Sequence, residues 1–306
     1  MKYYSILLFT LISCSTLTGK KVDIIAHRGA SAFLPEHTLE AYSYAHALGA
    51  DFIETDIVIT KDLEAICLHD IYLEPTTNVE EIFPKRNRPD GHWYAIDFTL
   101  KEIKKLKVHE RSENLKQVFT NRFPLNKSSF SVPTFKEFIE LVQGLNKSTG
   151  KNIGIYPEIK KPEFHEKEGI NSKQLTINII KNYGYFSQPN SLYIQSFDPK
   201  SLKWVFNQFN TLNLIQLIGE NSWKDASADF NFLKTNDGLN EIMKYAQGIG
   251  IWFNHLLQDP SIIKRAQERG LKVHVYTYRT ETQNKPMSYY AEKYHLDGIF
   301  TDNPTK

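Results

Sequence analysis

Residues 52–59 read Phe-Ile-Glu-Thr-Asp-Ile-Val-Ile, an apolar, β-branched stretch with two carboxylates near its centre. Seven similar short apolar runs lie at 22–26, 153–159, 192–197, 212–218, 249–253, 273–278 and 298–301. Segments with helical spacing separate most of them, the clearest at 38–48, 135–145, 172–183 and 260–270. Eight strands that alternate with helices predict an α/β fold, a (β/α)8 TIM barrel. An open doubly wound sheet would alternate in the same way, but the count of eight and the polar residues at strand ends favour the barrel.

Residues 70–132 interrupt this alternation. The segment is rich in Pro, Asn, Arg and aromatic residues, and it is too long for a simple barrel loop. We therefore expect an insertion after the second strand that caps the mouth of the barrel. Its aromatic residues either line a substrate pocket or pack together in a satellite cluster, and satellite packing is the more common arrangement.

The first 20 residues have the pattern of a signal peptide. A positive start at Lys2 is followed by an uncharged apolar run over 3–13, then by Cys14 and a small polar spacer. Residues 11–14, Leu-Ile-Ser-Cys, resemble the bacterial lipobox, in which a lipidated cysteine tethers the mature protein to a membrane. An ordinary cleaved signal is the alternative. In either case, we expect a domain over 21–306 in the bacterial periplasm or at the cell-envelope surface, with no membrane contact except through a lipid on Cys14.

Composition excludes several classes of function. The chain has 306 residues, of which 41% are hydrophobic, enough for one large domain with a sizeable core. Its formal net charge is +2 and no block of Lys and Arg stands out, so nucleic acid is not an expected partner. The sequence assigns no oligomeric state. Only Cys67 would remain after signal cleavage, so no intramolecular disulfide is expected in the mature domain.

Three carboxylates are candidate metal ligands. Glu54 and Asp56 are two positions apart on a predicted strand and therefore point to the same side. Glu158 lies near the carboxyl end of another predicted strand. Three converging carboxylates repel one another without a cation, and oxygen ligands favour Ca²⁺ or Mg²⁺ over zinc. Structural ion pairs with Arg28 or Lys160 are the alternative.

Two histidines could reach the same mouth, since His27 and His69 each follow an apolar run. Such a pair suits general acid–base catalysis across a bound phosphate, with one imidazole taking a proton and the other giving one. Arg28 and Lys160 supply positive charge for phosphate oxygens. The set fits a phosphoester site better than a glycosidase or esterase site. The sequence contains no Gly-x-Ser-x-Gly, P-loop, His-Glu-x-x-His or dinucleotide-binding motif.

The order of these motifs resembles that of the glycerophosphodiester phosphodiesterase family, most closely its periplasmic bacterial type. The matching segments are His27-Arg28-Gly29-Ala30, Pro35-Glu36-His37-Thr38, residues 49–56, Leu68-His69-Asp70, residues 94–100 and 144–156, Pro157-Glu158-Ile159-Lys160, Gln195-Ser196-Phe197-Asp198 and residues 297–302. The resemblance covers essentially all of the chain after the signal. It implies a (β/α)8 barrel with an insertion after the second strand. It also implies hydrolysis of deacylated phospholipids, such as glycerophosphocholine and glycerophosphoethanolamine, to glycerol 3-phosphate and the alcohol.

The resemblance also implies a role for each matching residue. It assigns Glu54, Asp56 and Glu158 to the metal, His27 and His69 to acid–base catalysis, and Arg28 and Lys160 to the phosphate. A route proposed for the family begins with attack of the glycerol 2-hydroxyl on phosphorus, and water then opens the cyclic ester. Calcium is the usual ion of the periplasmic type, so we expect Ca²⁺ rather than Mg²⁺.

The substrate pocket matches the family less closely. Many members carry a Trp-Thr pair late in the chain, where this sequence has Tyr276-Thr277. We expect Gln195, Phe197 and Tyr276 to line the pocket, with the tyrosine forming an apolar wall beside the glycerol. Residues 219–239 align loosely with the family, which leaves the side of the leaving alcohol undefined.

Two other functions remain open at this stage. A related barrel phosphodiesterase, such as a phospholipase-D-like enzyme, would cleave intact lipids, although such enzymes tend to have a smaller insertion. A surface lipoprotein would use the barrel to bind a host molecule or matrix. The complete set of carboxylates and histidines argues against a loss of catalysis.

Overall fold

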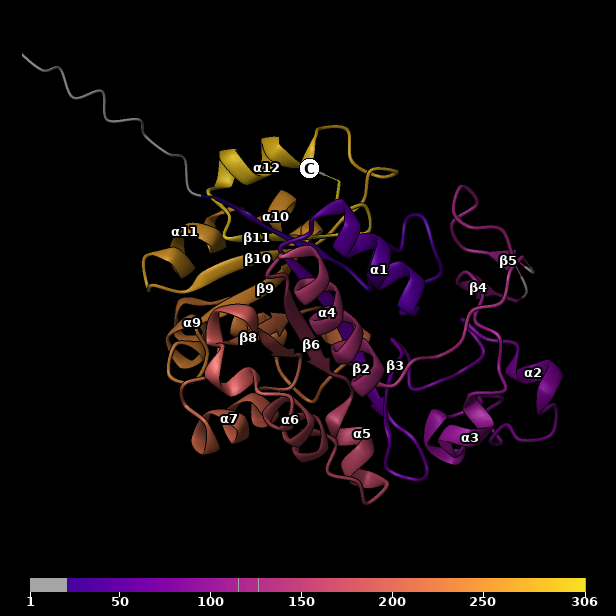
Figure 1. Cartoon of the computed structure of the whole chain (residues 1–306). Helices are drawn as coiled ribbons and strands as arrows, with labels where there is room; N and C mark the ends of the chain where they lie inside the picture. The colour runs from indigo at the N-terminus through magenta and orange to yellow at the C-terminus, as the bar shows by residue number, and fades with distance from the viewer. Residues whose placement is uncertain (1–20, 115, 126, 306) are drawn as a thin grey trace, which may run out of the picture.

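The structure is a computed structural model that describes residues 21–114, 116–125 and 127–305 (Figure 1). The predicted signal segment and Cys14 lie outside the described residues. No helix of the described part of the chain combines the length and the apolar character needed to span a bilayer.

Eight parallel strands close into a barrel, at the positions that the sequence predicts. They are β1 (Asp23–Ala26), β2 (Phe52–Ile59), β6 (Gly154–Ile159), β7 (Ile194–Ser196), β8 (Leu214–Ile218), β9 (Gly248–Trp252), β10 (Lys272–Tyr278) and β11 (Gly298–Thr301). Consecutive barrel strands pair side by side, and β1 pairs with both β11 and β2, which closes the ring. A short strand, β3 (Ala65–Cys67), folds back antiparallel onto β2. The predicted TIM barrel is confirmed.

Helices surround the barrel, and local capping sets where several of them begin. They are α1 (Leu39–Leu48), α4 (Phe135–Thr149), α5 (Pro162–Lys167), α6 (Ser172–Asn182), α7 (Pro199–Gln208), α8 (Phe230–Leu233), α9 (Asn236–Ile242), α10 (Phe253–Gln258), α11 (Ser261–Gln267) and α12 (Met287–Tyr294). Thr38 caps the first turn of α1, and Thr134 forms a capping box with Glu137 at the start of α4. Short 3-10 turns occur at η1 (Ala95–Asp97), η2 (Tyr185–Ser187), η3 (Pro189–Ser191) and η4 (Asn221–Trp223).

An aromatic layer fills the interior of the barrel. Phe52 and Tyr156 each pack against Tyr193, with ring centroids 4.9 and 5.0 Å apart, and Phe300 lies 5.0 Å from Tyr156. Tyr156 also bonds through its hydroxyl to His274 Nδ1 at 2.8 Å. The interior of the barrel is therefore a packed core and holds no central channel among the described residues.

The 70–132 segment forms a separate body on one side of the barrel (Figure 1). It contains α2 (Val79–Ile82), α3 (Leu100–Ile103), β4 (Ser112–Glu113) and β5 (Lys116–Gln117). Trp93, Tyr94, Phe98 and Phe130 are buried in a second hydrophobic cluster, which also takes in Val58 of β2 and Ile66 of β3. Of the two arrangements left open for these aromatic residues, they adopt satellite packing.

Candidate active site

A pocket of about 290 Å³ opens at the carboxyl ends of the barrel strands. All ten residues singled out in the sequence line it: His27, Arg28, Glu54, Asp56, His69, Glu158, Lys160, Gln195, Phe197 and Tyr276. They come from strands, or from the residues that follow them, spread over 250 positions of the chain. The closure of the barrel therefore brings together side chains that the sequence presents far apart.

Three buried carboxylates meet at one point of this pocket. Glu54 and Asp56 share one side of β2, and Asp56 lies in register with Glu158 on the neighbouring β6. One oxygen from each can be chosen so that all three lie within 4.8 Å of one another. Burial, reinforced by the nearby Asp56 carboxylate, raises the pKa of Glu54 and of Glu158 well above the usual range.

This carboxylate cluster fits a hard divalent cation. The three residues offer only oxygen donors, the ligand type that Ca²⁺ and Mg²⁺ prefer. Gln195 donates from Nε2 to Glu54 at 3.4 Å. Within the described residues, its buried Oε1 has no hydrogen-bond partner, so a further oxygen is available beside the carboxylates.

Asp56 differs from the other two carboxylates because it accepts a hydrogen bond from a histidine and lies near both Lys160 and Arg28. His37 Nε2 lies 2.9 Å from Asp56 Oδ2, and Tyr42 bonds to the other ring nitrogen of His37 at 2.8 Å. Burial alone would raise the pKa of Asp56, but Lys160, His69 and the His37 hydrogen bond outweigh it and hold the pKa well below its usual range. An ionised Asp56 is thus fixed in place before any ligand binds.

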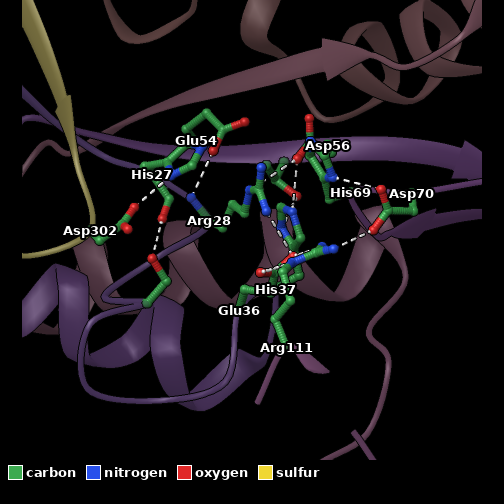
Figure 2. Close-up of polar contacts among 12 residues, drawn as sticks. His27, Arg28, Glu36, His37, Glu54, Asp56, His69, Asp70, Arg111 and Asp302 are labelled. Carbon is green, nitrogen blue, oxygen red and sulfur yellow. Dashed lines mark hydrogen bonds and ion pairs between the residues drawn. The ribbon is translucent and has the colours of Figure 1, made fainter. Parts of the chain in front are cut away.

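Arg28 enters the pocket from an unusual backbone turn. Its φ is 58°, in the left-handed region, and its backbone N–H donates to Glu54 Oε2 at 2.7 Å. The guanidinium donates to Glu36 at 3.0 Å, and its Nε lies 3.7 Å from Asp56 (Figure 2). That Nε is buried and makes no hydrogen bond within the described residues. Arg28 thus forms a structural ion pair and still has a donor available at the pocket.

Lys160 links the carboxylate cluster to one of the histidines. Its Nζ lies 3.3 Å from Glu158 and donates to His69 Nε2 at 3.2 Å. Burial would lower the pKa of Lys160, but Glu158 and Asp56 outweigh it and raise the pKa above its usual value. The side chain therefore remains positively charged beside the pocket.

Each of the two histidines is oriented by an aspartate. His27 Nδ1 lies 2.6 Å from Asp302, and His69 Nδ1 lies 3.0 Å from Asp70 (Figure 2). Burial favours the neutral carboxyl group, but the histidines and nearby arginines outweigh it and hold the pKa of both aspartates well below the usual range. An ionised carboxylate only accepts hydrogen bonds, so each imidazole donates from Nδ1 and keeps a lone pair on Nε2.

The same surroundings keep both imidazoles neutral. Burial, followed by the charge of Arg28, lowers the pKa of His27 to about 3 and that of His69 to about 4. A neutral imidazole can take a proton from a hydroxyl group through its Nε2 lone pair, and once protonated it is a strong donor. In His69 this lone pair accepts from Lys160 Nζ at 3.2 Å, a bond that a substrate hydroxyl would have to replace. The pair can therefore perform proton transfer on both sides of a bound group.

Several residues of the site were not assigned a role from the sequence. Four of them fall inside the motifs that carry the family resemblance: Glu36, His37, Asp70 and Asp302. Their place in those motifs is the only sequence feature that marks them as part of the site. Trp223 and Trp252 line the pocket with ring centroids 5.0 Å apart. Trp223 lies in the loop after β8 and Trp252 is the last residue of β9, and neither position falls in such a motif. Asp225 also lines the pocket and comes from the 219–239 stretch that the sequence left undefined.

The sequence of this chain is similar to those of known phosphodiesterases. Residues 27–306 match the sequence model of the glycerophosphoryl diester phosphodiesterase family. The chain is 37% identical to a glycerophosphodiester phosphodiesterase of Haemophilus influenzae, with 92% of this chain and 87% of that protein aligned. It is 35% identical to one of Treponema pallidum, with 85% of this chain and 81% of that protein aligned.

Solved structures share the fold. A phosphodiesterase of Oleispira antarctica, in complex with the product sn-glycerol-3-phosphate, has a TM-score of 0.63 at 20% identity, over 92% of this chain and 94% of that one. A glycerophosphodiester phosphodiesterase of Thermotoga maritima has a TM-score of 0.60 at 20% identity, over 93% and 96%. With the family match over residues 27–306, these findings lead to one conclusion: the chain belongs to the glycerophosphoryl diester phosphodiesterase family and is a phosphodiester hydrolase.

Proposed function

We propose that the enzyme hydrolyses glycerophosphodiesters, the deacylated phospholipids such as glycerophosphocholine and glycerophosphoethanolamine, to sn-glycerol 3-phosphate and the free alcohol. One observation carries the proposal: two neutral, aspartate-oriented histidines, His27 and His69, line the same pocket as three buried carboxylates. The Oleispira antarctica relative, bound to sn-glycerol-3-phosphate, supports the same product class.

The proposed route uses the two histidines in turn. The negative charge of a bound phosphodiester favours a proton on one imidazole, so the route starts with one histidine protonated and the other neutral. The neutral imidazole takes the proton of the glycerol 2-hydroxyl as its oxygen attacks phosphorus, and the protonated one donates its proton to the leaving alcohol oxygen. A cyclic glycerol phosphate results. In the second half, the imidazole that gave its proton takes one from water, and the first returns its proton to the 2-hydroxyl oxygen as the ring opens. The chain is thereby restored to its starting protonation state.

The charged residues around the histidines have complementary roles in this proposal. Arg28 and Lys160 hold the phosphate oxygens, since both are cationic and line the pocket. Glu54, Asp56 and Glu158 would hold a divalent cation, which supplies positive charge to the phosphoryl group when bound. We propose Ca²⁺ rather than Mg²⁺, because the predicted signal segment would export the enzyme to the calcium-rich periplasm or cell-envelope surface.

A substrate comparison tests the proposal against cleavage of intact lipids. Purified enzyme is supplied with Ca²⁺ and either glycerophosphocholine or lysophosphatidylcholine, and the released glycerol phosphate and choline are quantified. We expect release of glycerol 3-phosphate from glycerophosphocholine and little turnover of the lysolipid, because a pocket of about 290 Å³ is small for a substrate that carries a long acyl chain. Faster turnover of the lysolipid would overturn the assignment.

His27→Ala is the matched variant for this comparison. It removes one of the two proton-transfer groups, so we expect a loss of about 100-fold or more in kcat on glycerophosphocholine. Unchanged turnover would show that His27 does not take part in catalysis.

A further inference from the structure

The two aspartates that orient the histidines are themselves held by arginines of the 70–132 segment. Arg111 Nη1 donates to Asp70 Oδ2 at 2.7 Å (Figure 2). Arg122 Nη2 donates to Asp302 Oδ2. In both cases one carboxylate oxygen accepts from the imidazole and the other from the guanidinium. Two chains of the same kind, Arg–Asp–His, therefore enter the pocket from outside the barrel.

Both arginines are deep in the structure. The Arg122 side chain is 3% exposed and the Arg111 side chain 17%. Arg122 also bonds to Ser31 O at 3.2 Å and lies over the ring of Phe119. A buried guanidinium is costly unless its donors are used, and here the donors go to the aspartates behind the histidines.

Arg111 has a second contact with the site. It donates to both oxygens of Glu36, at 2.6 and 3.0 Å, and Glu36 accepts from Arg28 at 3.0 Å. One arginine thus fixes the partner of a histidine and the partner of the proposed phosphate-binding arginine. Asp302, in contrast, would still have a cationic partner after the loss of Arg122, because Arg279 Nε donates to it at 2.8 Å. The loss of Arg111 should therefore disturb the site more than the loss of Arg122.

We propose that Arg111 and Arg122 are positioning residues for the acid–base pair. By clamping Asp70 and Asp302, they hold His69 and His27 with Nδ1–H bonded to carboxylate and Nε2 directed to the pocket. The inserted segment is thereby a working part of the active site, although none of its described residues lines the pocket. The inference rests on the proposed function for its kinetic consequences only, because the orientation of the imidazoles can be measured without substrate.

The same segment offers a matched control. Arg88 donates to Asp97 of the same segment at 2.7 Å and to Glu168, at the end of α5, at 2.7 Å, so it ties the segment to that helix. It makes no contact with either histidine or its aspartate among the described residues. Arg88→Ala therefore removes a comparable ion-pair arrangement from the segment and leaves both Arg–Asp–His chains intact.

The test compares Arg111→Ala, Arg122→Ala and Arg88→Ala in the full-length enzyme. The kinetic readout is kcat and KM on glycerophosphocholine with saturating Ca²⁺. We expect kcat to fall about 10-fold for Arg122→Ala and about 100-fold for Arg111→Ala, the usual range for loss of a group that orients a functional side chain. KM should rise for Arg111→Ala alone. That variant also releases Glu36, which positions the proposed phosphate-binding Arg28. Arg88→Ala should keep the wild-type kcat, and guanidinium ion should partly restore the two site variants.

A second readout follows the imidazoles directly by nitrogen-15 NMR of the ligand-free protein. Wild type and Arg88→Ala should show both histidines protonated on Nδ1. Arg111→Ala should disturb only the His69 signals, and Arg122→Ala only those of His27. If either alanine variant does not fold, Arg111→Lys or Arg122→Lys replaces it, since lysine keeps the charge and lacks the fork.

The outcomes separate the two proposals. An equal loss of kcat in Arg88→Ala, or unchanged imidazole signals in the two site variants, would overturn the positioning role and leave the arginines as structural ties. A wild-type enzyme that does not cleave glycerophosphocholine would overturn the proposed function, while the NMR comparison would still decide the positioning role.

Discussion

The turn that follows β1 shows how single residues determine the geometry of the site. Arg28 and Gly29 have φ values of 58° and 84°, and this turn directs the Arg28 backbone N–H to Glu54. Gly29 lies directly against α1, where Ala30 N–H donates to Ala41 O at 3.0 Å. A Cβ atom at Gly29 would lie 2.9 Å from the backbone of Ala41.

Gly29→Ala should therefore destabilise the protein by about 2–3 kcal/mol, from the combined cost of the left-handed backbone and the contact with α1. Gly49→Ala is the control, because Gly49 has a φ of 82° and no atom within 4 Å of the added Cβ, so only the backbone cost, about 1 kcal/mol, applies. Urea unfolding measures both variants. Equal losses would show that the contact with Ala41 is easily relaxed.

His27 makes stability depend on pH in a direction that its lowered pKa sets. The unfolded chain takes up a proton near pH 6.5, whereas the folded protein does so only near about 3. The contribution of neutral His27 to the free energy of unfolding is therefore fully present above pH 6.5 and is lost as pH falls toward about 3. Between about pH 8 and about pH 5, wild type should lose about 2 kcal/mol through this group.

His27→Asn removes that contribution, so the unfolding free energies of wild type and variant should converge by about 2 kcal/mol over this interval. The measurement is denaturant unfolding at the two pH values, with a chelator present in all samples. If the unfolding free energies of the two proteins changed by the same amount between the two pH values, His27 would not be held neutral by burial.

At the scale of the elements, the strands were predictable because each is a short apolar run that ends in polar residues. β2 and β6 are covered on both faces, so their apolar character is nearly continuous and the carboxylates Glu54, Asp56 and Glu158 stand out. The contacts of Arg111 and Arg122 could not be predicted in this way. They join residues 41 and 180 positions apart, and nothing in the local sequence distinguishes these arginines from Arg88.

The inserted segment is held by a hydrophobic cluster that it shares with β2 and β3. Phe98 is fully buried there, with the ring of Phe83 5.4 Å away and Arg86 over its face. Phe98→Ala should therefore cost about 3–5 kcal/mol of stability. Phe232→Ala, at a ring that is 43% exposed, should change stability by no more than about 0.5 kcal/mol.

Urea unfolding followed by tryptophan fluorescence measures this pair, and Trp93 reports from within the cluster. Phe98→Ala should also reduce kcat, because it loosens the segment that supplies the arginines. A destabilised variant with undiminished kcat would argue that the segment and the site are independent.

For the whole molecule, closure of the barrel completes the site. β11 pairs with β1 in register, Thr301 opposite Ala26, so Asp302 meets His27 from the far end of the chain. Nine of the ten residues singled out in the sequence were predictable because a parallel barrel gathers the carboxyl ends of its strands, while His69 follows the antiparallel β3. Trp223 was not predictable, since its position depends on how the loop after β8 folds over the mouth.

The central claim is that phosphodiester hydrolysis takes place where Glu54, Asp56 and Glu158 hold a cation beside the two histidines. Its most direct test measures glycerol 3-phosphate release from glycerophosphocholine after the protein has been stripped with EGTA and EDTA. Glu158→Gln is measured alongside, with Glu163→Gln as control, because Glu163 pairs with Lys200 on the surface.

The account predicts that stripped enzyme is inactive and that Ca²⁺ restores turnover better than Mg²⁺. Glu158→Gln should need at least about 10-fold more Ca²⁺ for half-maximal activity, while Glu163→Gln should match wild type. If Mg²⁺ but not Ca²⁺ restored turnover, the proposed ion would be wrong and the proposed metal-binding residues would stand. Full activity in protein shown by elemental analysis to be free of metal would contradict the account.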